Sequence, residues 1–204
     1  MRVLRAPSPP GPVLSRRALA LVVVLLAGCG TKAPPSSAGS ESGRIKETRT
    51  PHGALMQEID LDRDGRPEIV NHYVERPDAP RLLVKKELDL NRDGRIDVRS
   101  YFNSAGQLEK EEMDSDYDAV FDHVDYYQAG ARVMTEYDTD GDARPNVFKY
   151  YTRSSDGTVM LERKERDEDG DGRIDLWERF DAEGRVVRMG RDTDGDGKMD
   201  VRED

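Results

Sequence analysis

Short stretches of alternating apolar and polar residues recur along the chain from about residue 53 onward. In one stretch Ile96 and Val98 flank a polar residue, and in another Ile174 and Leu176 do the same. Alternation with a period of two is typical of a half-buried β-strand. The stretches lead to aromatic residues at one recurring position, namely Tyr73, Phe102, Tyr127, Tyr151 and Phe180. We therefore predict strands whose aromatic side chains pack on one face; the alternative is an exposed aromatic stripe that binds peptide or glycan.

A turn sequence follows most of these stretches, and a second short segment then returns. The turns fall at residues 103–106, 128–130, 155–157 and 181–184, and each contains glycine. This order indicates antiparallel hairpins. The first repeat differs, because residues 76–80 contain two prolines, and a helix from Leu82 to Leu88 is an alternative there.

The length of the repeat shows whether the segments between the acidic loops are strands or helices. Acidic loops begin at intervals of 29, 25, 24, 29 and 25 residues, so a 25-residue repeat with a nine-residue loop leaves 16 residues. Two segments and their connection fit into that length only if each segment is about six residues long, which is a strand length. Repeats of this size stack on their neighbours. We predict a mainly β domain over residues 53–204, an elongated array of antiparallel hairpins joined by the acidic loops.

The six loops share one pattern of oxygen-bearing side chains. Each has Asp at the first position, Asp or Asn at the third, Asp at the fifth, and Asp, Glu or Asn at the ninth. In loop order the residues are Asp60, Asp62, Asp64 and Glu68; Asp89, Asn91, Asp93 and Asp97; Asp114, Asp116, Asp118 and Asp122; Asp138, Asp140, Asp142 and Asn146; Asp167, Asp169, Asp171 and Asp175; Asp192, Asp194, Asp196 and Asp200.

Alternating carboxylates in a tight loop converge, and their repulsion is unfavourable unless a hard cation lies between them. Calcium takes six to eight oxygen ligands, whereas magnesium prefers a smaller shell that keeps its waters. A single Asp-Gly pair is explained equally well as a turn between strands. Six copies in one register favour calcium, so we predict several Ca²⁺ sites.

The loops differ at their sixth and twelfth positions. Gly172 and Gly197 occupy the sixth position of the last two loops, and Glu178 and Glu203 the twelfth, as in an EF-hand loop. The third and fourth loops carry alanine at the sixth position, which costs about 1 kcal/mol if the turn needs positive φ. We rank the fifth and sixth loops as the strongest sites, then the first and second.

Residues 1–28 have the features of an export signal. Four arginines precede an apolar run from Ala18 to Gly28, which is too short to span a bilayer. The run ends directly before Cys29, and this arrangement resembles the lipobox of bacterial lipoproteins. The resemblance implies that Cys29 carries acyl chains that insert into a lipid bilayer. Residues 29–52, rich in Ser, Pro and Gly, are then a flexible tether.

The cysteine count, net charge and apolar content of the chain exclude some kinds of structure and partner. Cys29 is the only cysteine, so an intramolecular disulfide is excluded. The chain from Cys29 onward has 28 basic and 42 acidic residues, a formal charge of −14 that argues against nucleic acid as a partner. Low apolar content with this charge lies near the boundary of disorder, so bound metal would supply part of the folding free energy.

No pattern in the sequence indicates catalysis. The three histidines, His52, His72 and His123, have no zinc spacing and no evident nucleophile beside them. The glycines belong to Asp-Gly turns rather than to a phosphate-binding loop. We interpret the protein as not an enzyme.

Taken with the loops, the chain resembles bacterial cell-envelope lipoproteins with EF-hand-like D-x-D-x-D-G calcium repeats, and the loops are similar to those of dockerins and thrombospondin type 3 repeats. The resemblance implies a lipid-anchored protein of the cell envelope, in the outer membrane of a Gram-negative cell. We expect a scaffold or adhesin-like role with an envelope or extracellular protein partner. The alternatives are a calcium-dependent docking or sensor module, or an accessory protein of an envelope enzyme or secretion system.

Overall fold

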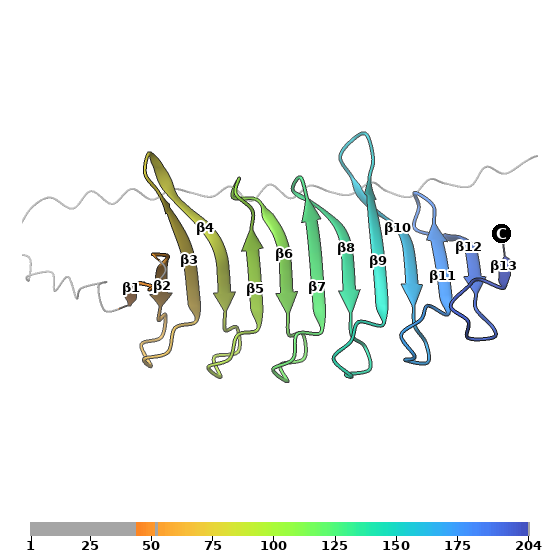
Figure 1. Cartoon of the computed structure of the whole chain (residues 1–204), viewed down its shortest axis with the longest axis horizontal. Coiled ribbons are helices and arrows are strands. Elements are labelled where there is room, and N and C mark those ends of the chain that lie inside the picture. Colours follow the sequence, from red (N-terminus) through yellow and green to blue (C-terminus); the bar gives the residue numbers. More distant parts are fainter. Residues whose placement is uncertain (1–43, 52, 204) are drawn as a thin grey trace, which may run out of the picture. The chain divides into compact units, whose positions relative to one another are not determined.

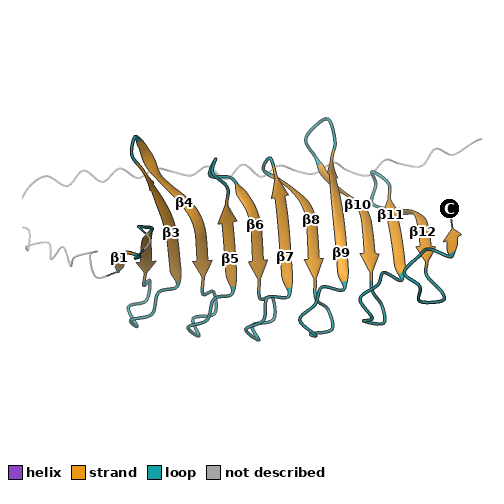
Figure 2. Cartoon of the chain, viewed as in Figure 1, coloured by secondary structure: helices purple, strands orange, loops and turns teal. Residues whose placement is uncertain are grey.

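A computed structural model describes residues 44–51 and 53–203, and within them every regular element is a β-strand. The strands form one antiparallel sheet in which each strand pairs with the next along the chain (Figures 1 and 2). The predicted mainly β fold of consecutive hairpins is therefore confirmed. Among the described residues, no helix is long or apolar enough to cross a membrane.

The sheet contains thirteen strands. They are β1 (Ile45–Arg49), β2 (Leu55–Ile59), β3 (Ile69–Arg76), β4 (Ala79–Leu88), β5 (Val98–Phe102), β6 (Leu108–Met113), β7 (His123–Gln128), β8 (Ala131–Tyr137), β9 (Val147–Arg153), β10 (Val159–Arg166), β11 (Leu176–Phe180), β12 (Val186–Arg191) and β13 (Val201–Glu203). Because successive strands run in opposite directions, their connections alternate between the two ends of the sheet. All six acidic loops therefore lie at one end, the lower one in Figure 1, and the hairpin turns lie at the other.

Two elements differ from the sequence-based expectations. The alternative helix from Leu82 to Leu88 is wrong, because these residues belong to β4, which pairs with both β3 and β5. Strand β1 falls inside the segment that composition assigned to the tether, so the sheet begins before residue 53. All residues of β1 are exposed, so its composition does not indicate a strand. The segment is a strand because it pairs with β2.

Strand pairing places the five recurring aromatic residues on one face of the sheet, which we call face 1. Tyr73 pairs with Leu55 and Leu83 on this face, and Phe102 pairs with Leu108. A register shift accompanies the recurring aromatic position in every hairpin from β3–β4 to β11–β12, as between Arg179 and Phe180. Such bulges strengthen the local twist of a strand pair.

A single open layer leaves the sheet with a thin apolar core. Among the described residues, the buried hydrophobic side chains are Leu55, Val98, Ala131 and Leu176. On the opposite face, face 2, long charged side chains cover the tyrosines. The Nζ of Lys110 lies 5.8 Å from the ring centres of both Tyr101 and Tyr126, and Arg163 stacks 4.0 Å above Tyr150. Side-chain stems of this kind shield apolar surface while their charges stay in water.

Candidate metal sites

Each acidic loop is organised around the carboxylate of its first residue. In the fifth loop, Asp167 accepts hydrogen bonds from the backbone N–H groups of Gly170 and Gly172, both at 2.8 Å. The first aspartates of the other five loops, Asp60, Asp89, Asp114, Asp138 and Asp192, bond the same two backbone positions. The sequence pattern therefore builds the same turn six times.

The other acidic positions also bond the loop backbone. Asp169 accepts from the N–H of Asp171 at 3.1 Å, and Asp171 accepts from Arg173 at 2.8 Å. The ninth residue, Asp175, reaches back to the N–H of Glu168 at 2.6 Å and so closes the loop. Side-chain bonds of this local kind hold Asp-rich turns without any ion. Within this framework the carboxylates of Asp167, Asp169 and Asp175 converge, whereas that of Asp171 does not join them.

The turn requires left-handed backbone at its sixth position. Gly172 has φ of 88°, and the alanines at this position in the third and fourth loops, Ala119 and Ala143, have φ of 78° and 66°. The fourth position is left-handed too, and this was not predicted from the sequence. Arg63 has φ of 71° and Tyr117 of 66° there. The signal was present in the sequence as the glycines at the fourth position of the last three loops, Gly141, Gly170 and Gly195.

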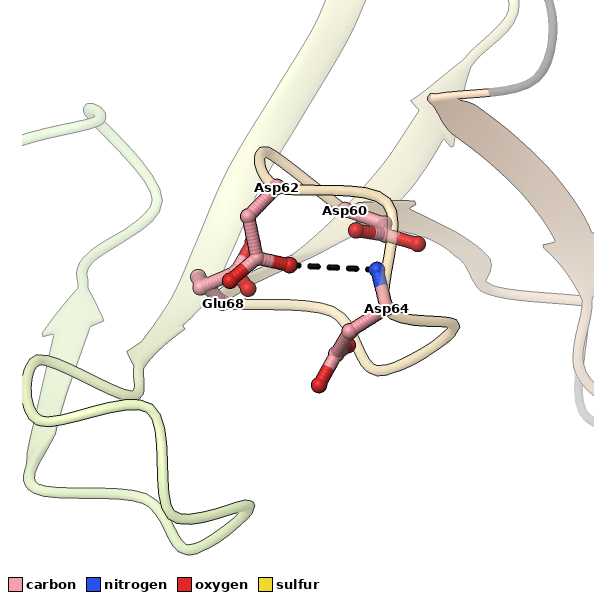
Figure 3. Close-up of side chains that lie close together, drawn as sticks. All are labelled: Asp60, Asp62, Asp64 and Glu68. Atoms are coloured by element: carbon pink, nitrogen blue, oxygen red, sulfur yellow. Dashed lines mark hydrogen bonds between the residues drawn. The ribbon is translucent and has the colours of Figure 1, made fainter.

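Carboxylate oxygens converge in five of the six loops. In each of these groups one oxygen from every residue lies within 4.8 Å of the others. The groups are Asp60, Asp62, Asp64 and Glu68; Asp114, Asp116 and Asp118; Asp138, Asp140 and Asp142; Asp167, Asp169 and Asp175; Asp192, Asp194 and Asp200. Figure 3 shows the first group, in which Asp62 and Glu68 lie beside each other and Asp62 bonds the N–H of Asp64. These groups could hold a metal ion, and their ligand atoms are oxygens, which suit hard cations.

Several predicted ligands lie outside these carboxylate groups. The second loop forms no such group of its own; there Asn91 donates its amide N–H to Asp93 at 3.3 Å. Asp122 accepts hydrogen bonds from Ser115 at the base of its loop, and Asn146 donates to Asp140 at 3.2 Å. Asp171 and Asp196 bond backbone N–H groups within their loops.

The structure does not bring the twelfth-position glutamates, Glu178 and Glu203, into the groups. Strand β11 begins at the tenth position of its loop, so Glu178 lies on the strand, and Glu203 likewise lies on β13. The Oε2 atom of Glu178 is 3.6 Å from Nη2 of Arg166 and 3.9 Å from Nζ of Lys164. The loops are thus shorter than an EF-hand loop, because pairing with the preceding strand resumes after the ninth residue.

The loop hydrogen bonds favour the ionised carboxylates. Partial burial acts to raise the pKa of Asp192, but the N–H groups of Gly197 and Gly195 outweigh it and hold the pKa below its ordinary value. The N–H and hydroxyl of Thr193 lower the pKa of Asp200 in the same way. Both residues are therefore anionic at neutral pH, the state in which a carboxylate binds a metal.

Backbone hydrogen bonds join each loop to the next one. The N–H of Asp89 bonds the carbonyl of Glu68 at 2.9 Å, and this link from the first residue of one loop to the ninth residue of the preceding loop continues through the array. Arg66 also donates to the carbonyl of Asp93 in the second loop at 3.3 Å. The loops therefore form one connected row rather than six independent turns.

Comparison with known proteins does not assign the chain to a family. No protein-family model matches the chain, and no curated protein matches it either. The predicted export signal, Cys29 and most of the tether lie outside the described residues.

Proposed function

We propose that the protein is an exported, membrane-anchored scaffold whose acidic loops bind calcium, and that it has no catalytic activity. One observation carries the calcium assignment. Five loops gather three or four carboxylates with ligand oxygens within 4.8 Å of one another, on a hydrogen-bond framework that all six loops share. A framework that repeats six times, while the residues between the acids vary, favours a common ligand over chance.

Calcium fits these groups better than other common cations. The donors are carboxylates on loops at one end of the sheet, and they leave room for backbone carbonyls and water in a shell of six to eight oxygens. Magnesium needs a tighter octahedron and releases its waters reluctantly. Zinc favours nitrogen and sulfur donors, and these groups contain neither histidine nor cysteine.

A structural role follows from the position of the loops. Each loop joins two strands of a sheet that has little apolar core, and the loops are hydrogen-bonded in a row. A divalent ion in each loop would oppose the net charge of the acidic chain and fix the connection between neighbouring hairpins. Calcium thus stabilises the sheet by binding its folded form.

The anchor rests on the sequence around Cys29, which follows the apolar run directly. Mass spectrometry of the protein purified from membranes tests it. We expect the N-terminal peptide to begin at an acylated Cys29, and Cys29→Ala to release the protein into the soluble fraction. An unmodified cysteine in a protein that still fractionates with membranes would refute the lipid anchor.

Calcium binding is tested by titration calorimetry of the full-length protein in detergent, followed by melting in calcium and in chelator. We expect several sites with dissociation constants of about 10⁻⁴–10⁻³ M, the range of extracellular structural modules. Micromolar affinity would favour the sensor alternative, because such sites respond to small changes in calcium. The proposal fails if no heat of binding is detected at millimolar calcium and the melting temperature is the same in chelator.

A further inference from the structure

A row of polar side chains crosses the middle of face 1, between the apolar residues near the loops and the recurring aromatic residues. Strand pairing places these residues directly opposite one another, from Asn71 on β3 through Lys86, Ser100, Glu111, Asp125, Thr135, Lys149 and Lys164 to Glu178 on β11. Two pairs in this row carry like charges. Glu111 faces Asp125, and Lys149 faces Lys164.

Hydrogen bonds and nearby cations offset the repulsion between the two carboxylates of the acidic pair, Glu111 and Asp125. Ser100 donates to Glu111 at 2.6 Å, and the hydroxyl of Thr135 donates to Asp125. Arg132 and His123 lie 3.3 Å from the carboxylate of Asp125. Burial acts to raise the pKa of Asp125, but these partners outweigh it and lower the pKa. This pair therefore needs no further ligand.

The basic pair has no comparable set of partners. Lys149 places its Nζ 4.5 Å above the ring of Tyr137, and among the described residues it pairs with no carboxylate. Lys164 reaches Glu178 only at 3.9 Å, and Arg166 joins the two lysines from the same face with its Nη2 3.6 Å from Glu178. Both distances are too long for hydrogen bonds. One carboxylate thus lies near two cations, and Lys149 adds a third cation opposite Lys164.

Two buried atoms of this cluster also lack partners. The Nε of Arg166 and the Oε2 of Glu178 are inaccessible to solvent and make no hydrogen bond within the described part of the chain. A buried donor without a partner is destabilising, and so are like charges directly opposite each other in a sheet. Burial lowers the pKa of Lys164, and the charges of Arg166 and Lys149 lower it further.

The three cations line an open hollow of about 630 Å³ between β8, β9 and β10. Its other lining residues are Tyr137, Thr139, Asn146, Val147, Asp167 and Glu168. The two acidic residues at its rim are engaged elsewhere, because Asp167 bonds the backbone of its own loop and Glu168 lies 3.4 Å from Arg191. Bonds to backbone N–H groups do not remove the charge of Asp167. Counted with Glu178 and with the Glu168–Arg191 pair, the three cations therefore leave a surplus of one positive charge, in a chain whose net charge is −10.

We propose that this hollow, which we call the basic hollow, binds a small soluble phosphate monoester. A phosphate monoester carries about two negative charges at neutral pH, and its oxygens can accept hydrogen bonds from all three cations. The fork of Arg166 and the point charges of two lysines are the donors that phosphate recognition uses. Bare phosphate would fill little of the space, whereas pockets of about 300–1,000 Å³ hold organic ligands. The three cations lie on β9 and β10, whereas the rim of the hollow is shared with the fourth and fifth acidic loops through Asn146 and Asp167.

Titration calorimetry of the full-length, detergent-solubilised protein in calcium tests the proposal with three sugars that share a ring. Glucose 6-phosphate is the dianionic probe, glucuronate carries one negative charge, and glucose carries none. We expect glucose 6-phosphate to bind at one site and at least ten-fold more tightly than glucuronate, and glucose not to bind. Absence of binding by glucose 6-phosphate at 10 mM, or equal binding of glucuronate, would overturn the proposal.

Variants then locate the site. Lys149→Gln should weaken glucose 6-phosphate binding at least ten-fold. Glu178→Gln should strengthen it several-fold, because the competing carboxylate is lost, and a folding defect would not produce a gain. Arg163→Gln is the matched control, since Arg163 is next to Lys164 on β10 but lies on face 2 beside Tyr150. Equal weakening by Lys149→Gln and Arg163→Gln would show general charge attraction and refute a defined site.

Discussion

Removing one carboxylate from the fifth loop should change stability in opposite directions with and without calcium. The substitution is Asp169→Asn, which keeps the oxygen that accepts the N–H of Asp171 but removes the charge. Asp169 converges with Asp167 and Asp175, with ligand atoms within 4.8 Å of one another. At this distance two unit charges in a water-like dielectric repel by about 1 kcal/mol. Relief of two such repulsions, reduced by salt, should stabilise the calcium-free protein by about 1 kcal/mol.

In calcium the sign reverses. For a site with a dissociation constant of about 10⁻⁴ M, about 10 mM calcium is a hundred times that constant and stabilises the folded state by about 2.7 kcal/mol. Emptying the fifth site removes this contribution, so the net loss is about 1.7 kcal/mol after the relief of repulsion is included. For a domain of this size 1 kcal/mol corresponds to about 2–4 °C in melting temperature. We expect Asp169→Asn to melt about 2–4 °C above the wild type in chelator and about 3–7 °C below it in calcium.

Asp181→Asn is the control. It removes the same charge at the opposite end of the sheet, where Asp181 accepts the N–H groups of Glu183 and Arg185. Asn103 already makes the same pair of bonds in another hairpin, so the substitution preserves the turn and removes the ion pair of Asp181 with Arg185, which calcium does not affect. Circular dichroism melts in calcium and in chelator measure both variants. The reasoning is refuted if Asp169→Asn shifts the melting temperature in the same direction in both buffers, as the control should.

Three further predictions concern single residues. Ala143→Gly should stabilise the protein by about 0.5–1 kcal/mol, because relief of left-handed strain exceeds the added entropy of the unfolded chain. Chemical denaturation measures this change in the free energy of unfolding. A loss of stability would contradict the strain inferred from the φ of 66° at Ala143. Asp125→Asn should cost about 1–3 kcal/mol at pH 7. Because the folded state lowers the pKa of Asp125, its contribution is present above the ordinary value of 3.8 and is lost as pH falls through the folded pKa. Between pH 7 and pH 3, the free energy of unfolding should therefore fall less in Asp125→Asn than in the wild type. Equal decreases in the two proteins would argue against a stabilising role for the ionised Asp125. Glu178→Gln should leave the number of bound calcium ions unchanged, because the side chain faces Arg166 and Lys164 rather than the loop. Titration calorimetry measures this number. If the variant binds one calcium ion fewer, Glu178 is a ligand of the fifth site and the prediction is wrong.

Local patterns in the sequence were sufficient to predict the hairpins and the acidic loops. Alternation around Ile96 and Ile174 indicates strands, and a repeat of about 25 residues excludes paired helices. Each loop is formed by bonds between residues at most seven positions apart, as from Glu168 to Asp175. A structure made by such near neighbours is readable from spacing alone. The strand β1 was not predicted, because its exposed residues have no apolar periodicity and its order comes from β2.

The side chains that meet across strands were decided by tertiary structure. The twelfth loop position had the spacing of a ligand, yet Glu178 lies on β11, because strand pairing resumes before that residue. The basic hollow was not visible in the sequence, since Lys149 and Lys164 are fifteen residues apart in a chain rich in charges. They become direct neighbours through the register of β9 and β10, which shifts between Leu161 and Arg163. A slip of one residue would turn Lys164 to face 2, because side chains alternate between the faces of a sheet.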